Sequence, residues 1–213
     1  MVNKSGTRRK LAELSRLPTN NRYGIPLVRK QLIDPDGIDL ISFTDICPAS
    51  KTETLINRVK GVHFFIDDDR FHAVVEGPDK YVDKLRPYRF VLTPDVSQYA
   101  DLPLCWQITA VEQNRTCGAI WQQNGLVVIP TVSWGSRDSY SVSFLGIEKE
   151  SIVAVATYGC RKRGKAFLDG YKAMLEAIEP CAVICYGAPF DDMEGTIFEV
   201  DPMASRKVDR NGR

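Results

Sequence analysis

Short apolar runs recur along the chain, and most of them are rich in valine and isoleucine without alternating polar positions. Their centres lie near residues 40, 64, 91, 129, 155 and 183. Strands of a parallel sheet show this pattern because helices cover both faces of the sheet. The chain is therefore expected to form an α/β fold with about six mostly parallel strands.

Segments of mixed polarity separate these runs and have the length of helices. We expect helices at residues 52–59, 78–85, 102–123 and 165–178, with Gly125 ending the third as its C′ residue. Residues 89–134 then form strand, helix and strand, the order of a βαβ unit. An open sheet and a reduced or irregular barrel both fit repeated βα units, whereas a full eightfold barrel usually needs about 250 residues.

The two ends of the chain lack this pattern. Residues 1–22 form a basic tail, in which six Lys and Arg residues accompany a single acid, Glu13. Residues 188–213 show no periodicity and are expected to be a second tail, so that one α/β domain spans residues 23–187. Within the domain, the alternation of Tyr140, Val142 and Phe144 is typical of an extended segment.

The composition is that of an ordinary globular protein, with 44% hydrophobic and 26% charged residues. The net charge of +1 argues against a strongly basic nucleic-acid-binding protein but allows a local basic patch. Six cysteines without a Cys-x-x-Cys pair and only two histidines argue against a zinc site. Because they lie in apolar runs, we expect reduced, buried thiols at Cys105, Cys117, Cys181 and Cys185. Neither an apolar stretch of about 18 residues nor a secretory h-region is present, so we expect a cytoplasmic protein without membrane contact.

The sharpest local feature is the basic loop Tyr158-Gly159-Cys160-Arg161-Lys162-Arg163-Gly164-Lys165, between an expected strand and an expected helix. Glycines let the backbone approach a ligand, and amide groups at a helix N-terminus favour an anion. The loop is therefore a candidate phosphate site, with Arg161, Lys162 and Lys165 as ligands. The alternative is a solvated basic loop, and the Gly-Lys-Ser/Thr ending of a Walker A loop is absent.

Carboxylates follow two expected strands that are neighbours in the chain. Asp67-Asp68-Asp69 comes after the second strand, and Asp95 comes after the third. In an extended segment Asp67 and Asp69 share a face, so either is a candidate partner of Asp95, and both are candidate ligands for Mg²⁺. Two carboxylates in one site bind a cation, or one of them holds a proton and can act in acid–base catalysis. The alternative is that these side chains pair with Arg70 or close turns.

Further candidates lie at the same strand ends. Arg115 is mid-helix and costly to bury unpaired, so we expect it to be exposed or bound to a carboxylate such as Asp95. With Asp95 and Asp67 it completes the candidate catalytic set. Trp121 is expected in the core. The candidate aromatic walls of a ligand pocket are Trp134, Tyr158 and Tyr186.

Three segments are distinctive in combination: HFFIDDDRF at 63–71, FVLTPDVSQYADLP at 90–103, and the run from Asn114-Arg115 through IWQQNGLVVIPTVSW at 120–134. Together they resemble the domain-of-unknown-function 4417 family, over residues 22–187. Members of this family occur in phages, plasmids and bacterial genomes. The resemblance therefore implies a mobile-element context, and a host cytoplasm for a phage-encoded chain, but it implies no activity.

We interpret the chain as a protein that binds a phosphorylated small molecule, such as a nucleotide, at the carboxyl ends of its strands. One alternative is a nucleic-acid-associated replication or accessory protein that contacts phosphates through the basic tail and residues 161–165. The other is a non-catalytic protein that binds a host partner or sequesters a ligand. No motif fixes a reaction, so the sequence leaves open whether the protein is an enzyme, and Mg²⁺ is the one cofactor that its residues suggest.

Overall fold

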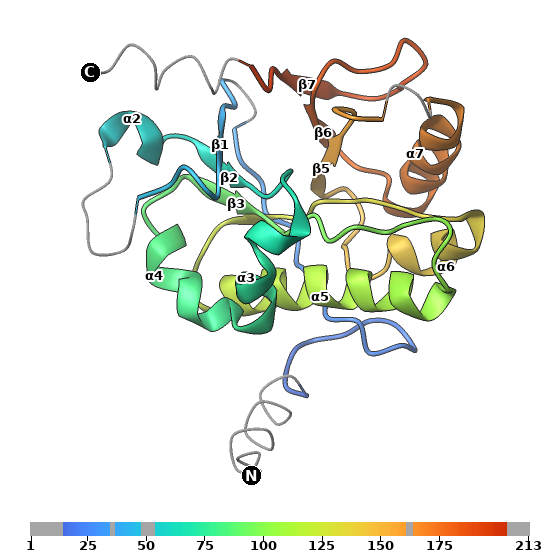
Figure 1. Ribbon diagram of the computed structural model, residues 1–213, viewed down its shortest axis with the longest axis horizontal. Helices are drawn as coiled ribbons and strands as arrows, with labels where there is room; N and C mark the ends of the chain where they lie inside the picture. Colours follow the sequence, from blue (N-terminus) through green and yellow to red (C-terminus); the bar gives the residue numbers. More distant parts are fainter. Residues whose placement is uncertain (1–14, 35–36, 48–53, 161–163, 204–213) are drawn as a thin grey trace.

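The computed structural model describes residues 15–34, 37–47, 54–160 and 164–203, and in them strands and helices alternate (Figure 1). The strands are β1 (Leu40–Ser42), β2 (Gly61–His63), β3 (Phe90–Leu92), β4 (Val128–Ile129), β5 (Ile152–Ala156), β6 (Ala182–Tyr186) and β7 (Ile197–Val200). The α-helices are α2 (Leu55–Arg58), α3 (His72–Glu76), α4 (Val82–Leu85), α5 (Leu104–Gln123), α6 (Tyr140–Ser143) and α7 (Gly164–Ile178). The 3-10 helices are η1 (Asp68–Arg70), η2 (Pro78–Tyr81) and η3 (Arg137–Ser139). The α/β fold expected from the sequence is confirmed.

All strand pairs are parallel, as the unbroken apolar runs predicted. The strand order is β1-β2-β3-β4 in one sheet and β5-β6-β7 in the other. A parallel bridge between Thr131 and Ala154 links the two sheets, so the order follows the chain without reversal. A doubly wound open sheet reverses its order at a switch point, whereas successive βα units of a barrel do not. Because side chains of β1 and β7 share one apolar cluster with those of β3 to β6, we describe the arrangement as an irregular barrel, although no ladder joins β1 to β7 among the described residues.

Side chains of the strands alternate between the inside and the outside of this barrel. In β5, Ile152 and Ala154 belong to a central apolar cluster, whereas Val153 and Val155 pack outward with residues of α7. All the other strands except β2 contribute to the same central cluster, through Leu40, Phe90, Leu92, Ile129, Ala182, Ile184, Tyr186 and Val200. The two sheets thus enclose one packed interior.

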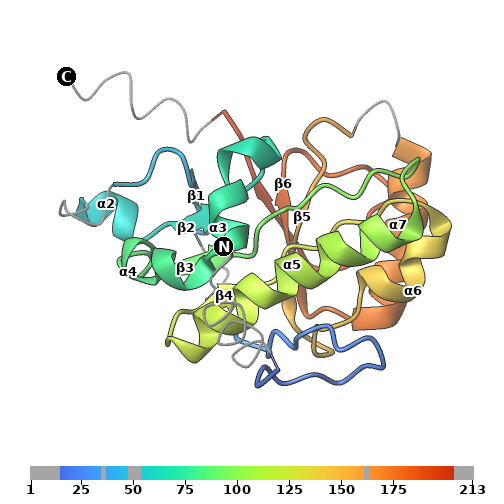
Figure 2. The same ribbon diagram turned by 60° about the horizontal axis from the view of Figure 1, so that its bottom comes forward.

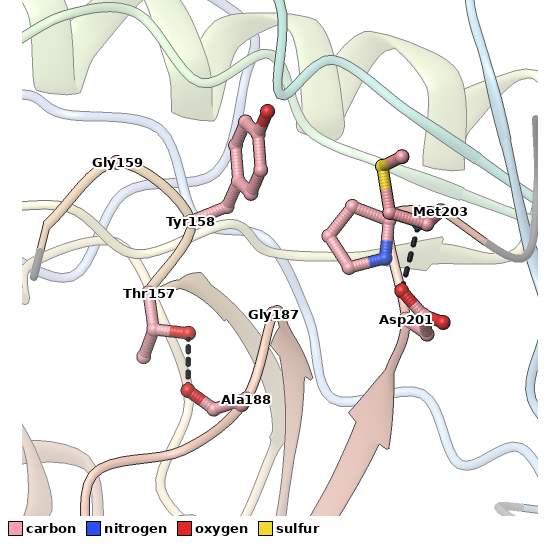
Figure 3. Close-up of a pocket in the computed structure, with 8 residues that line it drawn as sticks. Thr157, Tyr158, Gly159, Gly187, Ala188, Asp201 and Met203 are labelled. Atoms are coloured by element: carbon pink, nitrogen blue, oxygen red, sulfur yellow. Dashed lines mark hydrogen bonds between the residues drawn. The ribbon is translucent and has the colours of Figure 1, made fainter.

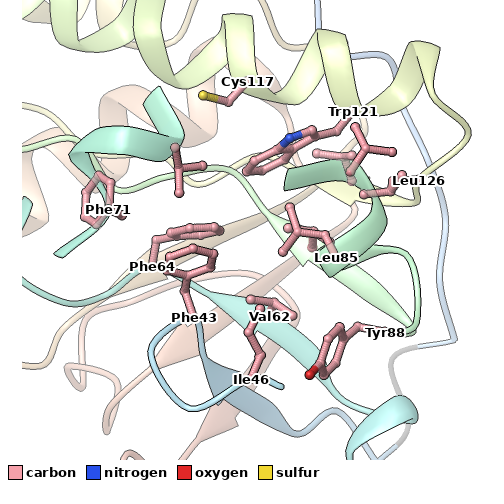
Figure 4. Packing of buried hydrophobic residues seen from close by; sticks show 14 of the residues in the cluster. Phe43, Ile46, Val62, Phe64, Phe71, Leu85, Tyr88, Cys117, Trp121 and Leu126 are labelled. Atoms are coloured by element: carbon pink, nitrogen blue, oxygen red, sulfur yellow. The ribbon is translucent and has the colours of Figure 1, made fainter. Parts of the chain in front are cut away.

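Helices cover the outer face of β1–β4 through a second cluster rich in aromatic rings (Figure 4). The ring of Phe64 lies between those of Phe43 and Trp121, at centroid distances of 4.9 and 5.7 Å. Trp121 is fully buried, and its Nε1 donates to the Pro78 carbonyl at 2.9 Å. The prediction that Trp121 belongs to the core is confirmed.

The two long helices bury different kinds of residues. Helix α7 buries an apolar face that includes Phe167, Tyr171, Met174 and Ile178, at the spacing of an amphipathic helix. Helix α5 buries polar side chains as well, among them Asn114 and Arg115. In the part of the chain that the structure describes, no helix has both the length and the apolarity to cross a membrane.

Two segments differ from the expectation. The alternation of Tyr140, Val142 and Phe144 indicated an extended segment, but Tyr140–Ser143 form helix α6. Tyr140 and Phe144 are four residues apart, which also places them on one face of a helix, and their ring centroids are 5.9 Å apart. In the expected C-terminal tail, Ile197–Val200 form β7 and pair with β6. A strand of four residues is too short to carry a clear periodicity.

The cysteines agree with the expectation only in part. Cys117 and Cys185 are buried as predicted. Cys105 and Cys181 were also expected to be buried, but both are exposed. Cys105 lies in the first turn of α5 on its solvent side, and Cys181 precedes β6. Apolar neighbours in the sequence were therefore not enough to predict burial of these two cysteines.

Gly118 of α5 gives a test of this packing. A Cβ at this position would lie 2.7 Å from side-chain carbons of both Val28 and Thr93, which are fully buried. Gly→Ala in a helix normally stabilises by about 0.5–1 kcal/mol. Here we predict that Gly118→Ala lowers the free energy of unfolding by about 1–3 kcal/mol, because neither neighbour can move away.

Chemical denaturation of the two proteins measures this difference. The exposed Thr109→Ala in the same helix is the control and should change the free energy of unfolding by less than about 0.5 kcal/mol. A Gly118→Ala variant more stable than the wild type would contradict the close approach of α5 to the sheet.

Candidate functional site

The carboxyl ends of the parallel strands lie at one end of the barrel, which we call the rim. Polar residues and glycines follow the strands there, in residues 93–98, 131–133, 157–159, 187–188 and 201–203. Ligands of parallel α/β proteins bind at this end, because the loops after the strands can vary without disturbing the core. The rim is also where the sequence predicted a site.

Asp95, which follows β3, is a half-buried carboxyl at the rim. The pKa of Asp95 is raised to about 6, chiefly by burial and to a smaller extent by the charge of Asp68, although the hydrogen bond with Ser133 lowers it. Ser133 follows β4 and is itself positioned by Gln98, whose Nε2 donates to the Ser133 carbonyl at 2.8 Å. The Ser143 hydroxyl donates to Gln98 Oε1 at 2.9 Å. A carboxyl with such a pKa can take up or release a proton near neutral pH.

Asp68 is the carboxylate that the fold brings toward Asp95, whereas the sequence suggested Asp67 or Asp69. The Asp68 oxygens accept hydrogen bonds from the backbone N–H and the hydroxyl of Ser97 at 3.2 and 3.0 Å. Asp67 precedes η1, Asp69 lies within it, and both are exposed. The alternation assumed for an extended segment does not hold there, since side chains of a 3-10 helix repeat every third residue.

Asp67 and Asp69 stay predicted ligands for Mg²⁺. Among the residues described, no group of three or more His, Cys, Asp or Glu side chains gathers in a way that could hold a metal ion. The two aspartates would therefore need water or a ligand to complete the coordination of a cation, as is usual for Mg²⁺.

Arg115 binds backbone carbonyls rather than a carboxylate, and only 2% of it is exposed. Its guanidinium donates to the carbonyl oxygens of Leu145, Thr131 and Ser143 at 3.0, 3.0 and 2.9 Å, and also to Asn114 Oδ1. The expectation of an exposed or carboxylate-bound Arg115 was wrong, because three backbone carbonyls and the Asn114 side chain accept four hydrogen bonds from its guanidinium. Burial lowers its pKa to about 9, so it stays charged at neutral pH. A catalytic role for Arg115 stays a prediction.

Two of the three candidate wall aromatics pack against other side chains of the protein, Tyr186 buried and Trp134 half-buried. The ring centroids of Trp134 and Phe167 are 5.1 Å apart. Trp134 also lies so close to Gly170 of α7 that a Cβ at position 170 would be 2.1 Å from Trp134 Nε1. Tyr186, 6% exposed, lies against His63 of β2, with 4.6 Å between the ring centroids. The contact between Tyr186 and His63 joins β6 to β2, and a ligand-binding role for Trp134 and Tyr186 stays a prediction.

A pocket of about 330 Å³ opens at the carboxyl ends of β5, β6 and β7 (Figure 3). Tyr158 is 58% exposed beside it, and its ring meets that of Tyr186 edge-on at 6.2 Å. The Thr157 hydroxyl donates to the Ala188 carbonyl at 2.8 Å and so ties the loops after β5 and β6 together. The lining residues are Thr157, Tyr158, Gly159, Gly187, Ala188, Asp201, Pro202 and Met203.

Gly187 allows the two loops beside this pocket to approach each other closely. Its φ of +102° lies in the region that favours glycine, and a Cβ there would lie 2.8 Å from the Thr157 hydroxyl and 2.9 Å from the Tyr158 nitrogen. The backbone after β6 therefore approaches the loop after β5 more closely than any side chain would allow.

The predicted phosphate-binding cations follow this pocket in the sequence. Arg161 and Lys162 lie outside the described residues. Lys165 is exposed in the first turn of α7 and does not line the pocket. A hydrogen bond from Arg137, with the charges of Arg137, Lys165 and Lys172, holds the pKa of Asp169 below its usual range. The charge of Lys165 thus interacts in part with the Asp169 carboxylate on α7 itself.

Sequence reasoning missed two acidic residues of the rim. Asp68 was passed over because η1 was not foreseen. Asp201 was passed over because β7 was not foreseen, although Ile197-Phe198-Glu199-Val200 followed by Asp201-Pro202 repeats the apolar run before Pro94-Asp95. A short apolar run that ends at an Asp and Pro pair was the signal from which Asp201 could have been found.

Residues 17–202 contain every strand that the structure describes and all of the rim except Met203, and they match the family model described as Domain of unknown function (DUF4417). The resemblance noted from the three sequence segments is thereby confirmed, over a longer part of the chain than those segments indicated.

Two phage proteins are similar to the chain. The Gene 1 protein of Mycobacterium phage L5 is 33% identical over 138 residues, which are 62% of this chain and 60% of the relative. The Gene 1 protein of Mycobacterium phage D29 is 34% identical over 129 residues, 59% of this chain and 48% of the relative. The chain therefore spans about half to three fifths of the length of these relatives. No solved structure matches it. Related to phage-encoded proteins and matched over most of its length, the chain belongs to the DUF4417 family.

Proposed function

We propose that the protein binds a phosphorylated small molecule of nucleotide size in the pocket at the carboxyl ends of β5, β6 and β7. The pocket itself is the observation that carries the proposal. Its volume of about 330 Å³ falls within the range of small-molecule sites. It also lies where successive parallel strands end, which is the usual ligand position in parallel α/β proteins.

The lining residues offer groups that suit the parts of a nucleotide. Tyr158 presents an exposed aromatic ring for stacking on a base. The Asp201 carboxylate accepts from the Met203 N–H at 2.8 Å and has a second oxygen with which to accept from a ribose hydroxyl. The phosphate would be bound by Arg161, Lys162 and Lys165, which follow Tyr158 within seven residues of the sequence.

Asp95 adds an ionisable group to the same rim. Its pKa of about 6 means that the folded protein holds this proton more tightly than the unfolded chain does. If the bound molecule is also converted, Asp95 is the residue suited to move a proton, with burial as the main cause of its raised pKa and Ser133 and Asp68 as smaller influences.

A thermal-shift panel of nucleotides and sugar phosphates tests the pocket. A ligand at 100 times its Kd adds about 2.7 kcal/mol, which raises the melting temperature of a domain of this size by roughly 5–10 °C. We predict such a shift for the wild type, and its loss in Tyr158→Ala and in Lys165→Ala.

Two matched controls separate the site from general effects. Tyr99→Ala removes another exposed tyrosine, and Lys172→Ala removes another exposed lysine of α7. Both should keep the full shift. A panel without any shift, or one in which the controls lose as much as the pocket variants, would disprove the proposed site.

The pKa of Asp95 predicts a pH-dependent stability. A raised carboxyl pKa stabilises the fold below about pH 4, and this contribution is lost as the pH rises through about 6. Asp95→Asn, which stays neutral, should therefore be more stable than the wild type at pH 7.5, on the order of 1–2 kcal/mol, with a much smaller difference at pH 4.5.

Urea unfolding at both pH values measures the two differences. The exposed Asp101→Asn in the same loop serves as the control and should stay within about 0.5 kcal/mol of the wild type at either pH. Equal effects of Asp95→Asn at pH 4.5 and 7.5 would show that Asp95 does not titrate between them.

A further inference from the structure

Residues 16–29, which we call the N-terminal hairpin, fold back on themselves beside α5 (Figure 2). Across the hairpin the Leu27 N–H donates to the Pro18 carbonyl at 2.7 Å. At the turn, Asn21 Oδ1 accepts from the N–H groups of Tyr23 and Ile25 at 3.2 and 3.1 Å. The hairpin thus has its own hydrogen bonds and presents its side chains at fixed positions.

A groove of about 440 Å³ lies between this hairpin and the C-terminal half of α5. Arg16 and Arg29 line it from the two arms of the hairpin, opposite Gln122 and Gln123. Gln122 Oε1 accepts from the Arg29 N–H, and Gln122 Nε2 donates to the Arg29 carbonyl, both at 2.8 Å. The backbone of Arg29 is therefore locked to α5, while its side chain is exposed at the groove.

The ion pairs formed by the described residues do not include Arg16 or Arg29. The nearby acids Glu148 and Glu150 are engaged by Lys30, through its backbone N–H and its side chain respectively. Two guanidinium groups that line one groove without a carboxylate between them favour an anionic ligand, and phosphate suits the guanidinium fork.

The tip of the hairpin carries an exposed aromatic ring. Tyr23 is 43% exposed, and the guanidinium of Arg22 lies 4.8 Å from its ring centroid. Arg22 also donates to the Tyr23 hydroxyl at 2.7 Å, which holds both side chains in place. Tyrosine rings and arginine planes are the surfaces on which bases of single-stranded nucleic acids stack.

We infer that the N-terminal hairpin and α5 form a binding surface for single-stranded nucleic acid. Arg16 and Arg29 contact backbone phosphates in the groove, and Tyr23 stacks on a base at the tip. A nucleic-acid strand fits better than a free phosphate, because the arginines and the Tyr23 ring follow one another along the hairpin. A single strand fits better than a duplex because its bases are accessible to stacking. None of these residues lines the pocket at β5–β7, so the inference is independent of the proposed function.

Fluorescence anisotropy with a labelled oligothymidine of about 20 nucleotides, longer than a typical single-strand site, tests the inference with the full chain. We expect Arg16→Ala/Arg29→Ala to weaken binding about tenfold. The slope of log affinity against log salt should fall in magnitude by about 1.4, since each phosphate contact to a single strand contributes about 0.7. Tyr23→Ala should weaken binding about fivefold or more without changing that slope.

Matched variants keep the result specific. Arg58→Ala/Arg70→Ala removes two exposed arginines from other elements and should leave affinity within about twofold, although the net charge changes equally. Arg16→Lys/Arg29→Lys keeps the charges and should keep the salt slope, and thermal melting confirms that each variant is folded. The inference would be overturned if the protein did not bind oligothymidine, or if the two Ala double variants lost affinity equally. It would also be overturned if a duplex bound as tightly as oligothymidine and Tyr23→Ala had no effect.

Discussion

The hydrogen bonds that Asn114 and Arg115 donate to backbone carbonyls hold α5 to the rim. Asn114 Nδ2 donates to the carbonyls of Pro94 and Thr131 at 2.7 and 3.2 Å, and Arg115 donates to Thr131 and to two carbonyls around the end of α6. A buried carbonyl that loses its partner costs about 1–3 kcal/mol, so this network is hard to replace with apolar residues. Asp95 and Ser133 each lie within two residues of one of these carbonyls. The position of the candidate proton-transfer group therefore depends on α5.

The packed interior of the barrel explains why a ligand must bind at the rim. Phe90 fills the space beside Gly61, where a Cβ would lie 2.2 Å from its ring. Tyr186 and His63 close the mouth above the central cluster. What is left for a small molecule is the space between loops, and one such space lies after β5, β6 and β7, beside the close approach of two loops at Gly187. The sheet thus sets the position of the site, and the loops set its chemistry.

The parts of this structure that could be predicted from the sequence are those with local signals. Strands with both faces buried show as unbroken apolar runs, and Gly125, with its φ of +79°, marks the end of α5. Asp68 could not be chosen over its two neighbours because that choice depends on a 3-10 turn. The backbone carbonyls that Arg115 contacts lie 16 to 30 residues away along the chain, and no local pattern reveals them. The family resemblance could be predicted because its motifs are contiguous, whereas the pocket is built from three separate loops.

Hydrogen–deuterium exchange of the full chain, with and without a mixture of nucleoside 5′-monophosphates, tests the central claim most directly. The account predicts slower exchange in residues 157–159, 187–188 and 201–203, because one ligand would contact the loops after β5, β6 and β7 together. Unchanged exchange in all three segments, or slower exchange confined to other parts of the chain, would contradict it.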